Sequence, residues 1–312
     1  MKKQDPLQNL AESDPGDDTL MRYRYQCTYA AIVSAGILLE ESGIEEVFCE
    51  HHEDVLVKME TGVFIGIQVK TRNLDLGPFE TDDSQMVNTI KRFLELELKF
   101  PNAFRNFVIA TNVGFSSKKS FKGLRYVVDF CDKTELSSNK NFNKYVNDFI
   151  TELKTDAKTV ISVLKKIRLK PDIGNFEGIR HKLISKVGEC LMGTSYTLAE
   201  ISRVADDMIS HHINASSLAF TSPLGDYFIL SNSPKEQKIA EVVEGKRVTK
   251  KIIEGFINRH KTEEIQLHLK DELSSHNGLT IPVPKWFGRI QKSHLLNENS
   301  TLVACVTLTC VT

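Results

Sequence analysis

Residues 50–72, EHHEDVLVKMETGVFIGIQVKTR, decide the fold of this chain. Val55, Val57 and Met59 alternate with Asp54, Leu56 and Lys58, and a run rich in β-branched residues follows from Val63 to Val69. Between them lies Glu60-Thr61-Gly62, a sequence typical of a turn. This pattern predicts two antiparallel strands joined by a hairpin.

The length of the hairpin loop determines which residues of the two strands face one another. A two-residue loop would pair Asp54 with Val69, on the wrong side of the sheet. In a three-residue loop, with Gly62 in the left-handed conformation, the numbers of paired residues add up to 122, so Asp54 faces Gln68 and is diagonal to Lys70. We therefore predict the three-residue loop, which gathers three polar side chains on one face.

These three side chains suit the hydrolysis of a phosphodiester bond. The carboxylate of Asp54 and the amide oxygen of Gln68 can hold a hard divalent cation, Mg²⁺ or alternatively Mn²⁺, because such ions prefer oxygen ligands. Gln68 could instead position water. Lys70 can polarise the attacking water and offset charge that develops on a phosphate. The alternative interpretation is a half-buried hairpin whose Asp, Gln and Lys side chains only face solvent.

The hairpin resembles the core of PD-(D/E)XK nucleases in its Gln-x-Lys form. The match extends along the chain through four further segments, namely residues 14–18 (DPGDD), 22–26 (RYRYQ), 90–97 (IKRFLELE) and 107–112 (FVIATN). Together they resemble the double-stranded DNA endonuclease domain of CD-NTase-associated (CBASS) effector nucleases, which also occurs in Lamassu-type, SMC-linked defence systems. The resemblance covers about residues 12–200 and implies an α/β fold, a restriction-endonuclease-like mixed sheet flanked by helices, with a mostly helical C-terminal region.

The resemblance also assigns roles to residues at the predicted site. Asp54 matches the central acid of the family, and Gln68 and Lys70 match its catalytic pair. Gln26 lies one turn into the first helix, from which a polar residue of the family approaches the metal site. Glu50 ends a short strand and is either a second carboxylate near the ion or a surface residue. Glu53 is interpreted as a solvated neighbour.

Contacts to DNA are expected from two groups of cations. Arg72 directly follows the second strand and is either a phosphate contact or part of a surface ion pair. The basic run 116–125, SSKKSFKGLR, is either a DNA-backbone contact or a solvated helix start. Lys and Arg neutralise phosphates without reading sequence. The cations of this run are Lys118, Lys119, Lys122 and Arg125.

The composition is that of an ordinary globular protein, with 312 residues, 41% of them hydrophobic and 26% charged. The net charge of −1 divides into −5 for residues 1–150 and +4 for residues 151–312, which does not single out a DNA-binding protein. We expect a flexible arm (1–15), a nuclease domain (16–200) and an α-rich adaptor or oligomerisation region (201–312). The six cysteines are scattered, which favours reduced thiols over a zinc site.

Further elements follow from hydrophobic periodicity and from helix start and stop signals. The pattern predicts helices over 20–39, 84–100, 176–191, 197–214 and 246–261, one or two helices over 142–169, and a further helix opened by Ser233, Pro234 and Glu236. Strands are predicted over 47–50 and 106–112, with one or two more between 218 and 230. Residues 300–312 are apolar and strand-like.

The expected function is a metal-dependent endonuclease of antiphage defence that acts on double-stranded DNA. Each site cuts one strand, which favours a homo-oligomer, and control is expected from a sensor partner, either an SMC-like complex or a cyclic-oligonucleotide pathway. The alternative is a catalytically inactive subunit that keeps the nuclease fold to bind DNA or protein. No apolar run reaches the ~18 residues of a membrane span and no secretory signal is present, so the cytoplasm is the expected location.

Overall fold

The computed structural model describes residues 15–131, 139–171, 173–218 and 234–261. Three predictions lie outside these residues, namely the arm up to residue 14, the strands between 219 and 230, and the apolar segment 300–312. None of the described helices is both long enough and apolar enough to cross a membrane.

The described residues form helices and strands in alternation. The helices are α1 (Pro15–Ala35), α2 (Ser84–Lys99), α3 (Leu124–Cys131), α4 (Lys140–Leu153), α5 (Ala157–Lys166), α6 (Ile179–Cys190), α7 (Leu198–Ser216), α8 (Pro234–Gly245) and α9 (Lys250–His260). The strands are β1 (Ile44–His51), β2 (Glu53–Met59), β3 (Phe64–Lys70), β4 (Phe104–Thr111), β5 (Ile167–Lys170) and β6 (Arg247–Thr249). The expected order of helix, strand, hairpin, helix and strand is therefore present.

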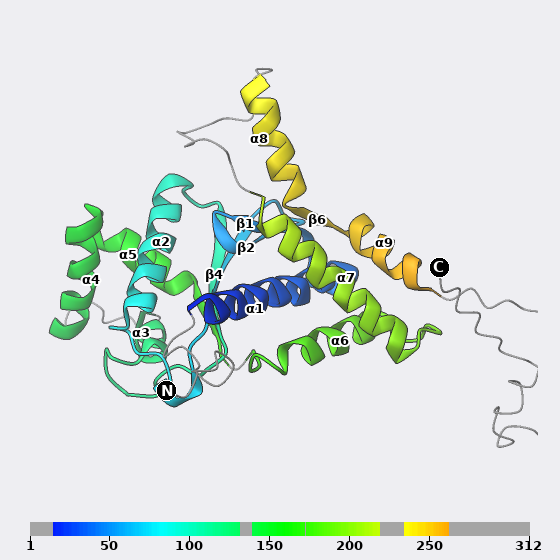
Figure 1. The fold of residues 1–312 in the computed structure, drawn as a ribbon. Helices are drawn as coiled ribbons and strands as arrows, with labels where there is room; N and C mark the ends of the chain where they lie inside the picture. Colours follow the sequence, from blue (N-terminus) through cyan, green and yellow to red (C-terminus); the bar gives the residue numbers. More distant parts are fainter. Residues whose placement is uncertain (1–14, 132–138, 172, 219–233, 262–312) are drawn as a thin grey trace, which may run out of the picture. The chain divides into compact units, whose positions relative to one another are not determined.

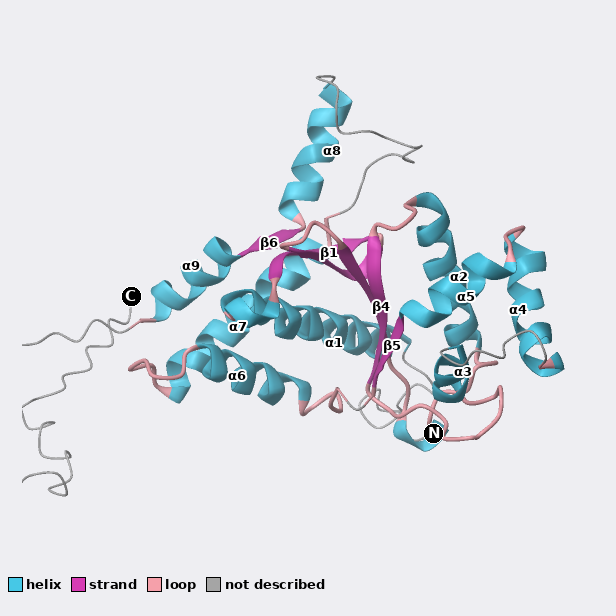
Figure 2. Ribbon diagram, turned by 180° about the vertical axis from the view of Figure 1, so that it is seen from behind, coloured by secondary structure: helices cyan, strands magenta, loops and turns pink. Residues whose placement is uncertain are grey.

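The strands form one mixed sheet in the order β5-β4-β3-β2-β1-β6. Neighbours are antiparallel from β6 to β3, whereas β3, β4 and β5 run parallel. Helices α1, α6 and α7 lie on one side of the sheet and α2 to α5 on the other, as Figures 1 and 2 show from opposite directions. This is the restriction-endonuclease-like α/β fold that the sequence predicts.

The alternation along β2 and β3 divides the buried side chains between two cores. Odd-numbered residues such as Val55, Val57 and Val69 pack with α1, α6 and α7, and Leu56, on the other face, packs with α2 to α5. Gln68 and Lys70 have even numbers and lie on the α2 side, where both line a cavity together with residues of α2.

The hairpin has the register that the sequence predicts. Val55 pairs with Ile67 and Val57 with Ile65, so the numbers of paired residues add up to 122. The loop contains three residues, because Met59 N–H donates to the Val63 carbonyl at 2.9 Å. Gly62 has a φ of 80°, the left-handed conformation that this loop requires. The three-residue loop is thus confirmed.

Two predicted helical segments are wrong at one end. The sequence predicts one or two helices over 142–169, and the structure has two, α4 and α5, but residues 167–170 form strand β5, which pairs with β4. The helix expected from Lys246 begins only at Lys250, because residues 247–249 extend the sheet beside β1. In both cases pairing with an open sheet edge overrides a local helical pattern.

Candidate active site

Three neighbouring strands bring Glu50, Asp54 and Gln68 into one row. The pairs Cys49–Val55 and His51–Glu53 put Glu50 of β1 across from Asp54 of β2. The register of the hairpin puts Gln68 of β3 on the other side of Asp54. Asp54 therefore lies in the middle of the row.

The strands β2 and β3 part beyond Val55 and Ile67, and the Asp54 carboxylate fills the place of the missing backbone partner. Asp54 Oδ2 accepts a hydrogen bond from the Val69 N–H at 2.7 Å. From α1, Gln26 Nε2 donates to the same oxygen at 3.3 Å and to the Val69 carbonyl at 3.4 Å. Gln26 thus lies beside Asp54, the position that the family resemblance predicts, and connects α1 to β3.

Gln68 connects Lys70 to the carboxylates. Lys70 Nζ donates to Gln68 Oε1 at 2.5 Å, and Gln68 Nε2 donates to Asp54 Oδ1 at 3.1 Å and to Glu53 Oε2. The amide therefore presents its nitrogen, not its oxygen, to the acids in this arrangement. A role of the Gln68 oxygen as a metal ligand would require the amide to turn over, and it stays a prediction.

Glu53 is part of this cluster, and the interpretation of it as a solvated residue is wrong. The residue is only 1% exposed, and its side chain lies over Gly66, where an added Cβ would come within 3.2 Å of Glu53 Cγ. Its Oε1 accepts no hydrogen bond from the described residues, although Arg92 Nε lies 3.4 Å away. The missing side chain of Gly66 is the sequence feature that makes room for this carboxylate.

Arg92 of α2 is a second residue that the sequence analysis missed. Its Nε donates to the His52 carbonyl at 2.9 Å, which fastens α2 to the turn between β1 and β2. His52 has a φ of 63°, so this turn is in the left-handed region. Arg92 lies on the polar side of an amphipathic helix, a position that usually indicates only a solvated face.

An open cavity of about 440 Å³ lies in front of Gln68 and Lys70. The polar stripe of α2 forms its other wall. The residues of this wall are Gln85, Asn88, Thr89, Lys91, Arg92 and Glu95. A polar groove with amide and cationic side chains beside the catalytic strand is suited to a sugar-phosphate backbone.

Burial is the main cause that raises the pKa values of the three carboxylates. Burial, followed by the charge of Asp54, raises the pKa of Glu50 to about 7, although this residue keeps contact with solvent. Burial is also the main reason why the pKa of Glu53 is raised to about 7. The pKa of Asp54 is raised by burial as well, against the opposing effect of the Lys70 charge. Such crowding is typical of acids that share a positive partner.

The oxygen atoms of these carboxylates fit the ligand preference of a hard divalent cation in part. No cluster of three or more His, Cys, Asp or Glu side chains with the arrangement of a metal centre occurs in the described part of the chain. Mg²⁺ does not need one, since it usually binds one or two carboxylates and keeps several waters. The crowded carboxylates of Glu50 and Asp54, and Glu53 Oε1, which pairs with Arg92 at 3.4 Å but accepts no hydrogen bond from the described residues, are the features that a cation would satisfy.

The sequence allows two roles for Arg72, a phosphate contact or an ion pair, and in the structure Arg72 forms an ion pair. Its Nη2 lies 2.8 Å from Asp83 Oδ2, and its guanidinium stacks 3.7 Å above the Phe79 ring. The side chain is only 13% exposed. Asn112, at the end of β4, holds the backbone of Arg72 through two hydrogen bonds of 3.0 and 2.8 Å. These contacts fix the exit of the catalytic strand.

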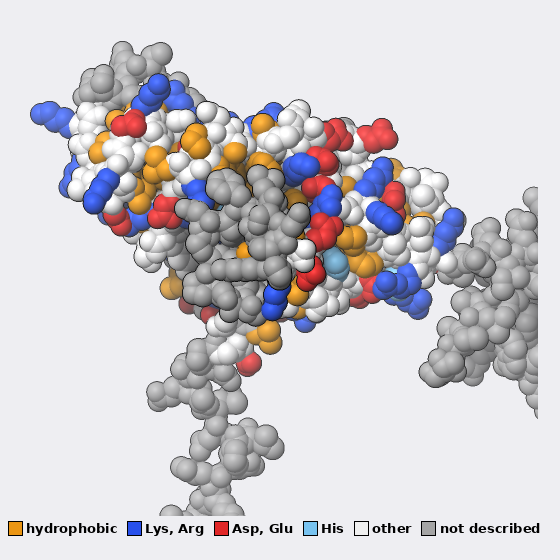
Figure 3. Space-filling view, turned by 90° about the horizontal axis from the view of Figure 1, so that it is seen from above, with side chains coloured by type: hydrophobic (Ala, Val, Ile, Leu, Met, Phe, Trp, Pro, Cys, Tyr) orange, Lys and Arg blue, Asp and Glu red, His pale blue; other side chains and the backbone are white. Residues whose placement is uncertain are grey.

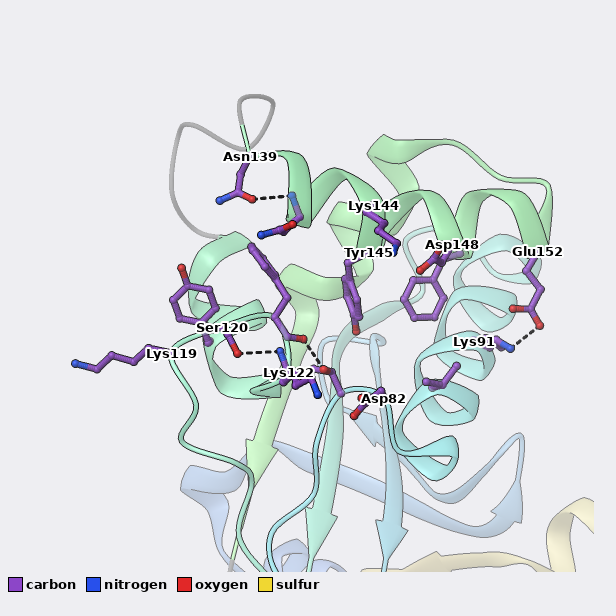
Figure 4. Close-up of a pocket in the computed structure, with 16 residues that line it drawn as sticks. Asp82, Lys91, Lys119, Ser120, Lys122, Asn139, Lys144, Tyr145, Asp148 and Glu152 are labelled. Atoms are coloured by element: carbon purple, nitrogen blue, oxygen red, sulfur yellow. Dashed lines mark hydrogen bonds and ion pairs between the residues drawn. The ribbon is translucent and has the colours of Figure 1, made fainter.

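The basic run of residues 116–125 is mostly a loop, and only its end belongs to α3. Lys118 is 56% exposed and pairs with Glu80 at 2.5 Å. Lys119 and Lys122 border a cavity of about 660 Å³ between α2 and α4. In Figure 4, Lys119 extends away from this cavity, and Lys91 on the opposite side is bonded to Glu152.

The charges on the molecular surface do not form a single basic field on the face seen in Figure 3. Lys and Arg side chains are interspersed there with Asp and Glu. This distribution agrees with the near-neutral net charge of −1. DNA binding by Lys118, Lys119, Lys122 and Arg125 therefore stays a prediction.

The fold and the cluster together define a class of protein. It is an α/β domain of the restriction-endonuclease type, with acids, an amide and a lysine gathered where two strands of the sheet part. Residues 14–215 match the family described as "Cap4, dsDNA endonuclease domain", and the chain belongs to this family. A search of curated proteins found no match.

The solved structures to which this chain is similar include two Cap4 receptors. The chain shares 14% identity, at a TM-score of 0.44, with the Acinetobacter baumannii Cap4 SAVED/CARF-domain containing receptor bound to the cyclic trinucleotide 2'3'3'-cAAA. It shares 15% identity, at a TM-score of 0.43, with the Moraxella osloensis Cap4 SAVED/CARF-domain containing receptor. These matches cover 86% and 76% of this chain, which spans 47% of each receptor.

Proposed function

We propose that the chain is a metal-dependent endonuclease that cuts double-stranded DNA in the cytoplasm as an effector of antiphage defence. The observation that carries the proposal is the row of Glu50, Asp54 and Gln68 across three strands, with Lys70 hydrogen-bonded to Gln68. Membership of the Cap4 double-stranded DNA endonuclease family supports the choice of substrate.

In this proposal Asp54 and Glu50 hold a Mg²⁺ ion, for which Mn²⁺ can substitute, with Gln68 as a third oxygen donor. When bound, the ion supplies Lewis-acid polarisation of the scissile phosphate. Lys70 orients the attacking water and offsets charge on the phosphate oxygens. Gln26 keeps the Asp54 carboxylate aimed into the row, and Arg92 holds the turn from which Glu53 and Asp54 emerge.

The proposal includes control by assembly. One site of this kind cuts one strand, so a double-strand break requires two sites, most simply in a homo-oligomer. A sensor partner, either an SMC-like complex or a cyclic-oligonucleotide pathway, would bring the copies together. Phosphate contacts by Lys118, Lys119, Lys122 and Arg125 would then add to the weak attraction that one near-neutral copy has for DNA.

The test compares cleavage of supercoiled plasmid by the wild-type chain with cleavage by Asp54→Asn and Lys70→Met, in Mg²⁺ and in EDTA. We expect each substitution to lower the rate at least roughly a hundredfold, since each removes a group that acts on the reacting phosphate or its water. The control is Lys58→Met, because Lys58 lies at the far end of β2 and pairs with Glu45 at 3.0 Å. Equal cleavage by all four proteins would contradict the assignment and favour an inactive nuclease-fold subunit, whereas cleavage in EDTA would contradict the dependence on a metal ion.

A further inference from the structure

We infer that Lys246 is a positioning residue for the active site and holds Glu50 in place from a segment beyond the matched residues 14–215. The inference rests on the proposed function, because Glu50 is one of the proposed ion donors. It connects the short strand β6, which has no place in the family match, to the row of acids in the sheet.

Lys246 bonds to β1 at two successive residues. Its carbonyl accepts a hydrogen bond from the Cys49 N–H at 3.0 Å, which begins the pairing of β6 with β1. Its Nζ turns back and donates to the Glu50 carbonyl at 2.9 Å. The side chain therefore acts on the backbone of the residue whose carboxylate belongs to the site.

The backbone of Glu50 needs such support. Its φ is 48°, in the left-handed region that residues with a side chain rarely adopt, and His52 follows with a φ of 63°. Such conformations persist only where the surrounding contacts enforce them. The ammonium of Lys246 fixes the Glu50 carbonyl on one side, and Arg92 fixes the His52 carbonyl on the other.

A lysine would be unusual at this buried position if its side chain only packed against its neighbours. Lys246 is 4% exposed, and burying an ammonium is unfavourable unless it serves a partner. Val248, two residues further on, is fully buried and already anchors the strand.

The experiment uses the full chain and two neighbouring substitutions. Lys246→Met keeps the apolar stem and removes the ammonium. Arg247→Met is the matched control, because Arg247 ties the same strand to Glu46 at 2.9 Å through Nε and does not contact Glu50. For each protein, Mn²⁺ affinity is measured by calorimetry, plasmid cleavage is measured across Mg²⁺ concentrations, and Tm reports on folding.

We expect Lys246→Met to weaken Mn²⁺ binding roughly tenfold and to raise the Mg²⁺ concentration for half-maximal cleavage equally, as for residues that orient ligands. Arg247→Met should lower Tm and change the Mn²⁺ affinity less than about twofold. In a Glu50→Ala background, Lys246→Met should add little, because the two residues act through one another.

Three results would overturn the inference. They are wild-type Mn²⁺ affinity in Lys246→Met, an equal loss of affinity in Arg247→Met, and a fully additive effect in the Glu50→Ala background. Failure of the proposed function gives a different result, since a wild-type chain that binds Mn²⁺ but does not cut DNA leaves the role of Lys246 measurable by calorimetry. A wild-type chain that neither binds Mn²⁺ nor cuts would overturn both.

Discussion

At Gln68, the proposed ion and the observed hydrogen bonds require opposite orientations of the side-chain amide. Its oxygen accepts from Lys70, and its nitrogen faces Glu53 and Asp54, whereas an ion beside Asp54 would need the oxygen. Among common side chains only an amide can serve both arrangements, because it carries a donor and an acceptor on one plane. The substitution Gln68→Glu distinguishes the two arrangements, because a carboxylate can bind the ion but cannot donate a hydrogen bond to the acids.

Gln68→Glu should retain Mg²⁺-dependent plasmid cleavage, whereas Gln68→Met should lose it roughly a hundredfold. In EDTA the glutamate variant should have a lower Tm than wild type, because it adds a carboxylate beside Glu53 and Asp54. Addition of Mg²⁺ should raise its Tm by more than that of wild type, since the ion binds the folded state. Equal loss of activity in both variants would mean that the nitrogen of Gln68 is what the site needs.

His212 of α7 provides a test of stability that is independent of the active site. It is fully buried, with Nε2 2.8 Å from Ser34 Oγ and Nδ1 2.7 Å from the Met208 carbonyl, and burial lowers its pKa to about 4. An unfolded chain would protonate this imidazole near pH 6.5. Between these values the unfolded state binds the additional proton, so stability is complete above pH 6.5 and is lost as the pH falls.

The free energy of unfolding should therefore decrease on acidification, with a slope from His212 of up to roughly 1.4 kcal/mol per pH unit. In His212→Gln, urea unfolding between pH 7.5 and 5 should show a smaller decrease than in wild type. The remaining slope includes His211, whose pKa is also lowered by burial. Parallel curves for the two proteins would contradict the assignment of a neutral, buried His212.

Some residues of the candidate site could be predicted from the sequence, and others could not. Asp54, Gln68 and Lys70 are recognisable because a two-residue period and a turn fix their relation. Glu53 is not, because its burial depends on Gly66 of another strand and on Phe107 of a third. Arg92 and Lys246 donate hydrogen bonds to backbone carbonyls, and the identity of the residue that carries such a carbonyl does not indicate the contact.

The hairpin is the element whose loop length and register were predictable, although its strands part before Asp54 and Gln68. Its register depends on local features only, namely the alternation of the two strands and the left-handed Gly62. An added Cβ at Gly62 would meet no heavy atom within 4 Å, so any effect of alanine there comes from the backbone conformation and not from crowding.

Gly62→Ala should destabilise the chain by about 1–2 kcal/mol, which is the penalty of the left-handed region for a residue with a Cβ. Gly62→Asn should be less destabilising, because asparagine tolerates this region. Both values are measured by urea unfolding against wild type. Equal stability of the glycine and alanine proteins would contradict the three-residue loop, as would an asparagine variant less stable than the alanine variant.

Strands β5 and β6 were beyond local reasoning. Residues 167–170 and 247–249 are short and lie next to helices, so their own preferences favour continuing the helix. What decides their conformation is an unpaired edge far away in the sequence, on β4 and β1 respectively. Backbone groups at such an edge are satisfied by any extended segment that reaches them.

At the scale of the whole molecule, the matched residues 14–215 do not contain the complete core. Val248 of β6 and Ile253, Phe256 and Ile257 of α9 are buried in the same core cluster as α1 and α7. Burying each of these side chains contributes roughly 1.5–3 kcal/mol, and total stability is typically about 5–15 kcal/mol. Residues 234–261 therefore carry a substantial share of the stability of the fold.

A chain that ends at Lys261 is the reference, and compared with it a chain that ends at Ser216 should be largely unfolded or aggregated. The shorter chain loses the four buried apolar side chains named above from this core cluster and also exposes the edge of β1 for pairing with other molecules. Circular dichroism on heating and size-exclusion chromatography measure the two effects. Phe256→Ala in the full chain is the point control and should lower stability by about 3 kcal/mol. If the chain ending at Ser216 melts at the temperature of the longer one, β6 and α9 are dispensable, and Lys246 loses the scaffold from which it reaches Glu50.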